Sequence, residues 1–169
     1  MKKKLAMLLA LLCLLSMLVS FTGSAFAEEA QYTATKDFLS FLDQKEIKYE
    51  YLGVSDDRER VSVEFEMDNF PSLTCYLIFN YDNEEVSLRI WNIVTASAGK
   101  NYILTTLNSI EYDYKFVKFV YDESDSTVQA ELDMYIDGNH CGRSVYDAMM
   151  AMFNVTDNEE VAPLLHALE

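Results

Sequence analysis

The spacing of apolar residues changes several times along this chain, and each change predicts a new element of secondary structure. In "KDFLSFLDQKEI" the apolar positions recur three and four residues apart, which predicts an amphipathic helix. Its apolar face comprises Phe38, Phe41 and Leu42, with Leu39 at the edge of that face. Thr33 or Thr35 is placed to cap the start of the helix, because threonine hydroxyls accept hydrogen bonds from the first free amides.

A period of two follows, and it predicts strands. "KYEYLGV" is a short strand, and from Arg60 the residues Val61, Val63 and Phe65 alternate with polar neighbours. "LTCYLIF" is apolar on both faces and is expected to lie in the middle of a sheet, and "VSLRIWNIV" alternates again. Because tight turns such as "DNFPS" and "YDNEE" separate these strands, antiparallel pairing is predicted.

The second half repeats the two patterns. A helix after "TASAG" is predicted from a stripe of Ile103, Leu104, Leu107 and Ile110, and the strands "KFVKFVYD" and "TVQAELDMYI" follow it. "SVYDAMMAMF" predicts an apolar helix, and the last segment is helical if Pro163 lies within its first turn. The predicted order is α-β-β-β-β-α-β-β-α(-α). This order indicates an α+β fold, with an antiparallel sheet and helices packed on one of its faces.

The first residues have the three parts of a secretory signal peptide. Three lysines precede an apolar run, and Ala25 and Ala27 supply the small residues of a cleavage site before Glu28. An uncleaved anchor is the alternative, but Thr22, Gly23 and Ser24 interrupt the apolar run just before that site. We therefore expect residues 1–27 to be removed and residues 28–169 to form a single domain. The mature protein is expected to be secreted or held in the cell envelope, without stable membrane association.

Charge narrows the range of partners. The three leader lysines are part of 13 basic residues, so the mature chain carries 10 bases against 28 acids, a net charge of −18. Such a surface repels phosphate backbones, which argues against nucleic-acid binding. Acidity also keeps exported proteins soluble, and basic partners are only weakly favoured by it.

Candidate chemistry is sparse. "DGNHCG" brings Asp137, His140 and Cys141 together, and an imidazole beside a thiol can activate a nucleophile. A cysteine-dependent enzyme or redox protein using Cys141 and His140 is therefore one hypothesis. The alternative is a polar turn followed by a cysteine that packs beneath a helix start. Cys75 and Cys141 are permitted to form a disulfide after export, but their setting favours two unpaired thiols.

Other motifs of catalysis or ligand binding do not occur in the sequence. The five glycines form no phosphate-binding loop, and the two histidines have no zinc-site spacing. The acidic loops lack the spacing of a calcium-binding loop. No catalytic residue, cofactor or metal is therefore predicted. Exposed tyrosines such as Tyr112, Tyr114 and Tyr135 favour an interaction surface instead.

The segments "LNSI", "YKFVKFVYDE" and "TVQAELDMYI", with the closing "SVYDAMMAMFNV", together resemble the YbjN family of bacterial proteins, labelled sensory transduction regulators. The resemblance covers most of residues 33–168, although many relatives carry asparagine where this chain has Glu111. It implies a curved antiparallel sheet with helices beside it, similar to type III secretion chaperones and often dimeric. It implies no catalytic residues. Secretion chaperones are cytoplasmic, so the signal peptide is a departure from them. The signal peptide, the missing catalytic motifs and this resemblance together point to an exported, non-enzymatic module that binds a protein or peptide, or regulates one.

The strand "TVQAELDMYI" is the predicted partner-binding face. It ends the sheet in sequence order, so we expect it at an exposed edge or face. Its outward residues are Gln129, Glu131, Asp133 and Tyr135. Acids at these positions favour a basic partner and disfavour self-pairing, so a homodimer is expected to use helices or another strand.

Overall fold

The computed structural model describes residues 30–169. The signal peptide, the cleavage site at Ala25, Ala27 and Glu28, and Cys13 therefore lie outside the described residues. The elements are α2 (Thr33–Gln44), β1 (Glu50–Ser55), β2 (Arg58–Glu66), β3 (Ser72–Asn80), β4 (Glu85–Thr95), α3 (Lys100–Asp113), β5 (Lys118–Asp122), β6 (Thr127–Tyr135), α4 (Gly142–Thr156) and α5 (Ala162–His166). The predicted order of helices and strands is confirmed.

All strands join one sheet in the order β1-β2-β3-β4-β6-β5, and every neighbouring pair is antiparallel. β3 lies inside the sheet, as its two apolar faces predicted. The expectation that β6 forms an edge is wrong, because β4 and β5 flank it. Sequence order does not reveal that β5 joins on the far side of β6. β5 pairs with β6 only as far as Glu131, so residues 132–135 are paired by β4 alone.

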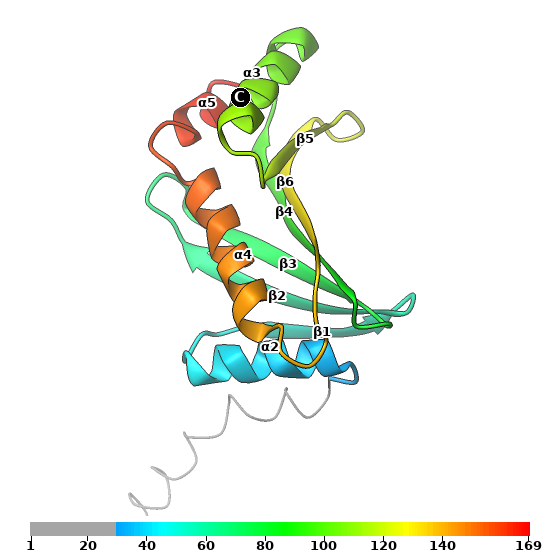
Figure 1. Cartoon of the computed structure of the whole chain (residues 1–169). Helices are drawn as coiled ribbons and strands as arrows, with labels where there is room; N and C mark the ends of the chain where they lie inside the picture. Colours follow the sequence, from blue (N-terminus) through cyan, green and yellow to red (C-terminus); the bar gives the residue numbers. More distant parts are fainter. Residues whose placement is uncertain (1–29) are drawn as a thin grey trace, which may run out of the picture.

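The sheet is bent, and the helices lie along one side of it (Figure 1). Two register shifts accompany the bend, one in β1 beside Gly53 and one in β4 between Ile90 and Val94. Bulges of this kind increase local twist, and Gly53 adopts a φ of 83° that suits glycine. The α+β class with a curved antiparallel sheet and helices beside it is confirmed.

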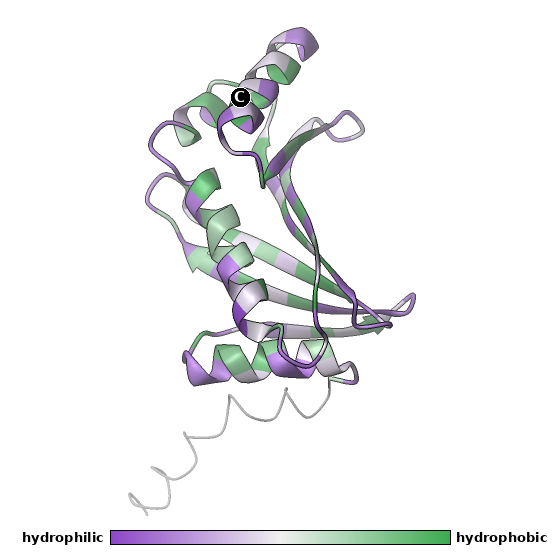
Figure 2. Ribbon diagram, viewed as in Figure 1, coloured by the Kyte–Doolittle hydropathy of each residue, from purple (hydrophilic) through white to green (hydrophobic). Residues whose placement is uncertain are grey.

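One hydrophobic core fills the space between the sheet and the helices. Strands and helices both show alternation of apolar and polar residues along the ribbon (Figure 2). Among the largest fully buried side chains are Phe38, Phe79, Phe153, Met149, Met152 and Leu88. Two predicted faces need correction, because Leu39 belongs to this core and Leu104 of α3 is exposed.

The start of α2 is held by other elements and not by a threonine cap. Tyr32 precedes the helix, so the expectation of a cap at Thr33 or Thr35 is wrong. The carboxylate of Glu59, fully buried in β2, accepts hydrogen bonds from the amides of Gln31 and Tyr32 and from the Tyr51 hydroxyl. Asn83 Oδ1 accepts from the Ala34 amide at 3.0 Å. A buried carboxylate with three donors is satisfied, and it fixes the chain at the start of the described residues.

Within residues 30–169, no helix combines the length and the apolar character needed to cross a membrane. Cys75 and Cys141 are both buried and free, so the interpretation as two unpaired thiols is confirmed. Burial raises the pKa of the Cys75 thiol to about 12.

Candidate functional site

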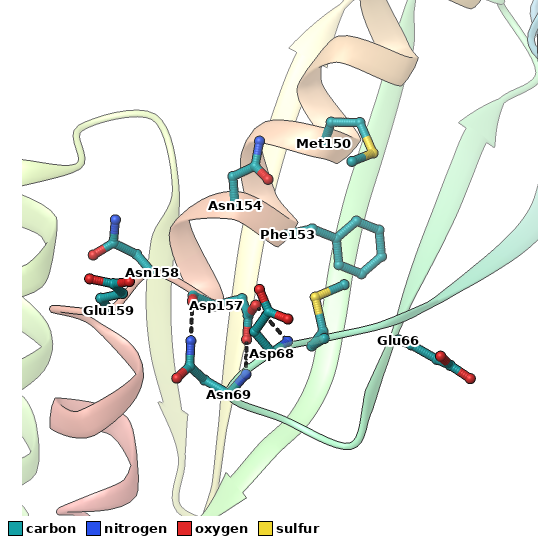
Figure 3. Close-up of a pocket in the computed structure, with 10 residues that line it drawn as sticks. Glu66, Asp68, Asn69, Met150, Phe153, Asn154, Asp157, Asn158 and Glu159 are labelled. Atoms are coloured by element: carbon teal, nitrogen blue, oxygen red, sulfur yellow. Dashed lines mark hydrogen bonds between the residues drawn. The ribbon is translucent and has the colours of Figure 1, made fainter.

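A groove opens where the loop between β2 and β3 meets the end of α4 (Figure 3). Its cavity volume is about 490 Å³, which lies within the range of ligand sites. The strand side contributes Glu66, Met67, Asp68 and Asn69, and the helix side contributes Met150, Phe153, Asn154, Asp157, Asn158 and Glu159. Segments almost ninety positions apart thus form one concave surface.

The floor of the groove is apolar. Met67 and Met150 are half-buried, and Phe153 is fully buried with its ring edge-on to Phe65 at a centroid distance of 5.0 Å. Phe153 therefore belongs both to the core and to the groove. Methionine side chains are flexible and polarizable, so two of them beside a fixed ring form a floor that adapts to different apolar groups.

The rim is acidic. Asp68, Asp157 and Glu159 line the groove, whereas the Glu66 side chain at its end points away from it (Figure 3), and the lining contains no lysine, arginine or histidine. Carboxylates gathered without a base create a negative potential that attracts cations. The described residues hold no group of three or more histidine, cysteine or acidic side chains that could bind a metal ion. A cation that also carries apolar groups would match both the acidic rim and the apolar floor.

Asp157 also holds the strand-side loop in place. Its carboxylate accepts hydrogen bonds from the amides of Asp68 (3.0 Å) and Asn69 (2.8 Å), and Asn69 Nδ2 donates to its carbonyl at 2.7 Å (Figure 3). On the other side, His166 Nε2 lies 3.1 Å from the Asn69 carbonyl, and its ring stacks on Phe70. The bond to that carbonyl, assisted by Glu169, raises the pKa of His166. The groove therefore has a fixed wall.

The predicted partner-binding residues lie on the face of the sheet that the helices leave open, which we call the outer face. Gln129 and Glu131 are half-buried, Asp133 is exposed, and Tyr135 is 86% exposed. Cross-strand register aligns one row over all six strands: Lys118, Glu131, Arg89, Tyr76, Ser62 and Glu50. The acids of β6 therefore lie among bases.

Arg89 engages both of those acids. Its Nη2 lies 2.8 Å from Asp133 Oδ1 and its Nε lies 3.8 Å from Glu131 Oε1. Partial burial alone would raise the pKa of Asp133, but bonds from Ser87 and Arg89, with the charge of Arg89, lower it. Gln129 Nε2 donates to Glu131 at 2.8 Å. Much of the negative charge predicted for this face is thus neutralised within the protein.

The "DGNHCG" segment is a turn followed by a packed cysteine, as its alternative interpretation held. The His140 amide donates to the Asp137 carbonyl, and Cys141 precedes α4 at 2% exposure. Its thiol donates to the Ala34 carbonyl at 3.4 Å. Burial, reinforced by the Asp37 carboxylate, raises the pKa of Cys141 to about 12. A thiol in this state is protonated at neutral pH, which is the opposite of an activated nucleophile.

Sequence reasoning missed the groove. "MDN" and "TDNEE" read as ordinary acidic turns, and their distance along the chain gives no sign that they meet. The sequence did contain one usable signal. Each acidic turn follows a large apolar residue, Met67 before the first turn and Phe153 before the second. Apolar residues beside charged turns are typical of a surface that is partly covered.

No protein-family model and no curated protein matches the sequence. Among solved structures, a chain of the crystal structure of the ExsC-ExsE complex is similar to this one. The two are 16% identical, the match covers 77% of this chain and 91% of that chain, and the TM-score is 0.49. Membership of the YbjN family stays a prediction.

Proposed function

We propose that this chain is an exported, non-enzymatic bacterial module of the YbjN type, which binds a basic segment of a protein or peptide outside the cytoplasm. The groove between the β2–β3 loop and α4 carries the proposal. Its floor of Met67, Met150 and Phe153 is apolar, and its rim is acidic without a base. The leader sequence supports export, and the buried, protonated state of Cys141 disfavours the cysteine-dependent alternative.

A basic peptide satisfies both parts of the groove. Lysine and arginine side chains carry apolar stems with a charged tip, so a stem can pack on the methionines while its tip meets a rim carboxylate. Neighbouring apolar residues of the peptide would pack on the half-buried side chains of Met67 and Met150. An acidic peptide would bring like charges together, which opposes binding.

The row of Gln129, Glu131, Asp133 and Tyr135 on the outer face is the alternative location for such a partner. Its acids already pair with Arg89, so a basic peptide there would compete with an existing partner. A lysine or arginine of the peptide would have to replace Arg89, and exchanging one ion pair for another gains little affinity. The groove is therefore the preferred location.

The test uses the chain from Glu28 onward and two fluorescent peptides, one alternating lysine with leucine and one alternating glutamate with leucine. We expect saturable binding of the basic peptide, weakened by added salt, and no binding of the acidic one. Replacing the groove acids, Asp68→Lys with Glu159→Lys, should weaken binding roughly tenfold or more. The matched control on the outer face, Glu131→Lys with Asp133→Lys, should leave the affinity within about threefold.

The outcomes separate the two locations. Loss of binding only in the Glu131→Lys, Asp133→Lys variant would move the partner to the outer face. Equal binding of the two peptides, or no binding of either, would contradict the proposed function. Circular dichroism of each variant checks that the fold is kept.

A further inference from the structure

We propose that the outer face carries a second site, independent of the groove, which binds a neutral saccharide against Trp91 and Tyr76. Trp91 is the one tryptophan of the sequence, and 40% of its surface is exposed. Its ring centroid lies 4.4 Å from that of Tyr76, with 32° between the ring planes. The two rings therefore stack on each other, and together they form one aromatic surface on the side of the sheet without helices.

The sheet itself brings the two rings together. Tyr76 of β3 lies opposite Arg89 of β4, so Trp91, two residues further along β4, projects from the same face. The register shift of β4 follows at once, and Asn92 adopts a φ of 53° within it. Bulges redirect side chains at sheet surfaces and are frequent beside functional sites.

A shallow cavity lies on each side of this aromatic surface. One, of about 270 Å³, is lined by both rings together with Ser72 and Asn92. The other, of about 350 Å³, is lined by Tyr76 together with Ser62, Glu64 and Glu50, among others. Thr74 and Tyr76 line both cavities, so the two are adjacent. An elongated ligand crossing Tyr76 would occupy both.

The polar groups in these cavities match the chemistry of sugar hydroxyls. A pyranose ring offers a face of C–H groups that packs on an aromatic ring, and hydroxyls around its edge that both donate and accept hydrogen bonds. Glu64 accepts one bond, from Ser72 Oγ at 2.7 Å, and a carboxylate has room for about three more. Serine, threonine and asparagine side chains line the remaining edge.

A proline-rich peptide would also pack on the two rings, but its backbone offers mainly carbonyl acceptors. Proline has no backbone N–H, so a run of prolines packed on the rings cannot donate to Glu50 or Glu64, whereas a sugar hydroxyl can. The lining also selects against acidic sugars, because it holds two carboxylates and a single base, Lys48. The ligand class is therefore an uncharged oligosaccharide.

The experiment titrates the chain from Glu28 onward, which contains the whole described core, with soluble oligomers of N-acetylglucosamine and of glucose. Oligogalacturonate and oligoproline serve as comparisons. Because no other tryptophan is present, fluorescence reports contact at Trp91 directly. We expect a saturable change with at least one neutral oligosaccharide and none with the two comparison ligands.

Calorimetry on variants then places the ligand. Trp91→Ala should weaken binding roughly tenfold or more, and Trp91→Phe should weaken it less because a ring remains. Phe116→Ala removes an aromatic side chain that is 87% exposed elsewhere, and it should change nothing. The proposal is overturned if neither neutral oligosaccharide gives a saturable response at millimolar concentration. It is also overturned if binding survives Trp91→Ala, or if oligoproline or oligogalacturonate binds as well as the sugars.

Discussion

The groove and the outer face both carry acidic side chains, but only the outer face carries the bases that neutralise them. On the outer face, Arg89 contacts Glu131 and Asp133, and Lys118 lies opposite Glu131. In the groove, three carboxylates line one cavity that holds no base. The charge of the outer-face acids is therefore largely balanced within the protein, whereas that of the groove acids stays available to attract a cation.

The aromatic side chains of the two regions differ in how far they are buried. Phe153, at the floor of the groove, is 1% exposed and packs edge-on against Phe65. Trp91 on the outer face is stacked on Tyr76 but remains in contact with solvent. The groove is therefore part of the core, and its shape depends on the stability of the fold. Substitutions of exposed residues on the outer face should change the free energy of unfolding little.

Truncating the two aromatic residues should show the largest difference between the regions. Phe153→Ala removes a buried ring and leaves a cavity, so we expect it to lower the free energy of unfolding by about 3–5 kcal/mol. Trp91→Ala should lower it by only about 1 kcal/mol, mainly through the lost contact with Tyr76. Chemical denaturation measures both values. Equal losses would mean that the outer face is as much a part of the core as the groove floor.

Asp157→Ala tests whether the wall of the groove is fixed. This change removes the carboxylate that accepts from the amides of Asp68 and Asn69, so we expect a loss of about 1–3 kcal/mol. Hydrogen exchange at those two amides should become faster. Glu159→Ala, on the same rim, should stay within about 0.5 kcal/mol of the unaltered protein. Unchanged exchange in Asp157→Ala would show that other contacts hold the loop.

Arg89→Gln tests the paired acids of the outer face, with the smallest expected effect. The pKa of Asp133 is lowered in the folded protein, so its contribution to stability is present above the ordinary aspartate pKa of about 3.9. That contribution is lost as the pH falls through the lower, folded-state pKa. We expect Arg89→Gln to lower the free energy of unfolding by less than about 1 kcal/mol at neutral pH, because Asp133 is half exposed. In acid, where Asp133 is protonated, the loss should be smaller still. Thermal unfolding across this pH range measures the difference, and a cost that grows in acid would contradict the pairing.

The elements and their order follow from patterns that are visible along the chain. Alternation at Val61, Val63 and Phe65 predicted β2, and the apolar faces of "LTCYLIF" correctly placed β3 inside the sheet. The setting of Cys141 predicted a packed thiol after a turn, and burial confirms it. These features depend on contacts between near neighbours along the chain, where periodicity of two or of three to four residues is visible in the sequence.

Which elements lie side by side depends on long-range packing and could not be predicted from these patterns. β6 became an interior strand because β5 pairs with it on the side away from β4. Arg89 neutralises acids more than forty positions away, and Asp157 fixes a loop almost ninety positions before it. Strand pairing and the packing of α4 against the sheet set these contacts. The spacing of residues along a single element does not predict which other elements pack against it. The groove exists for the same reason, since each of its two walls alone is an ordinary acidic turn.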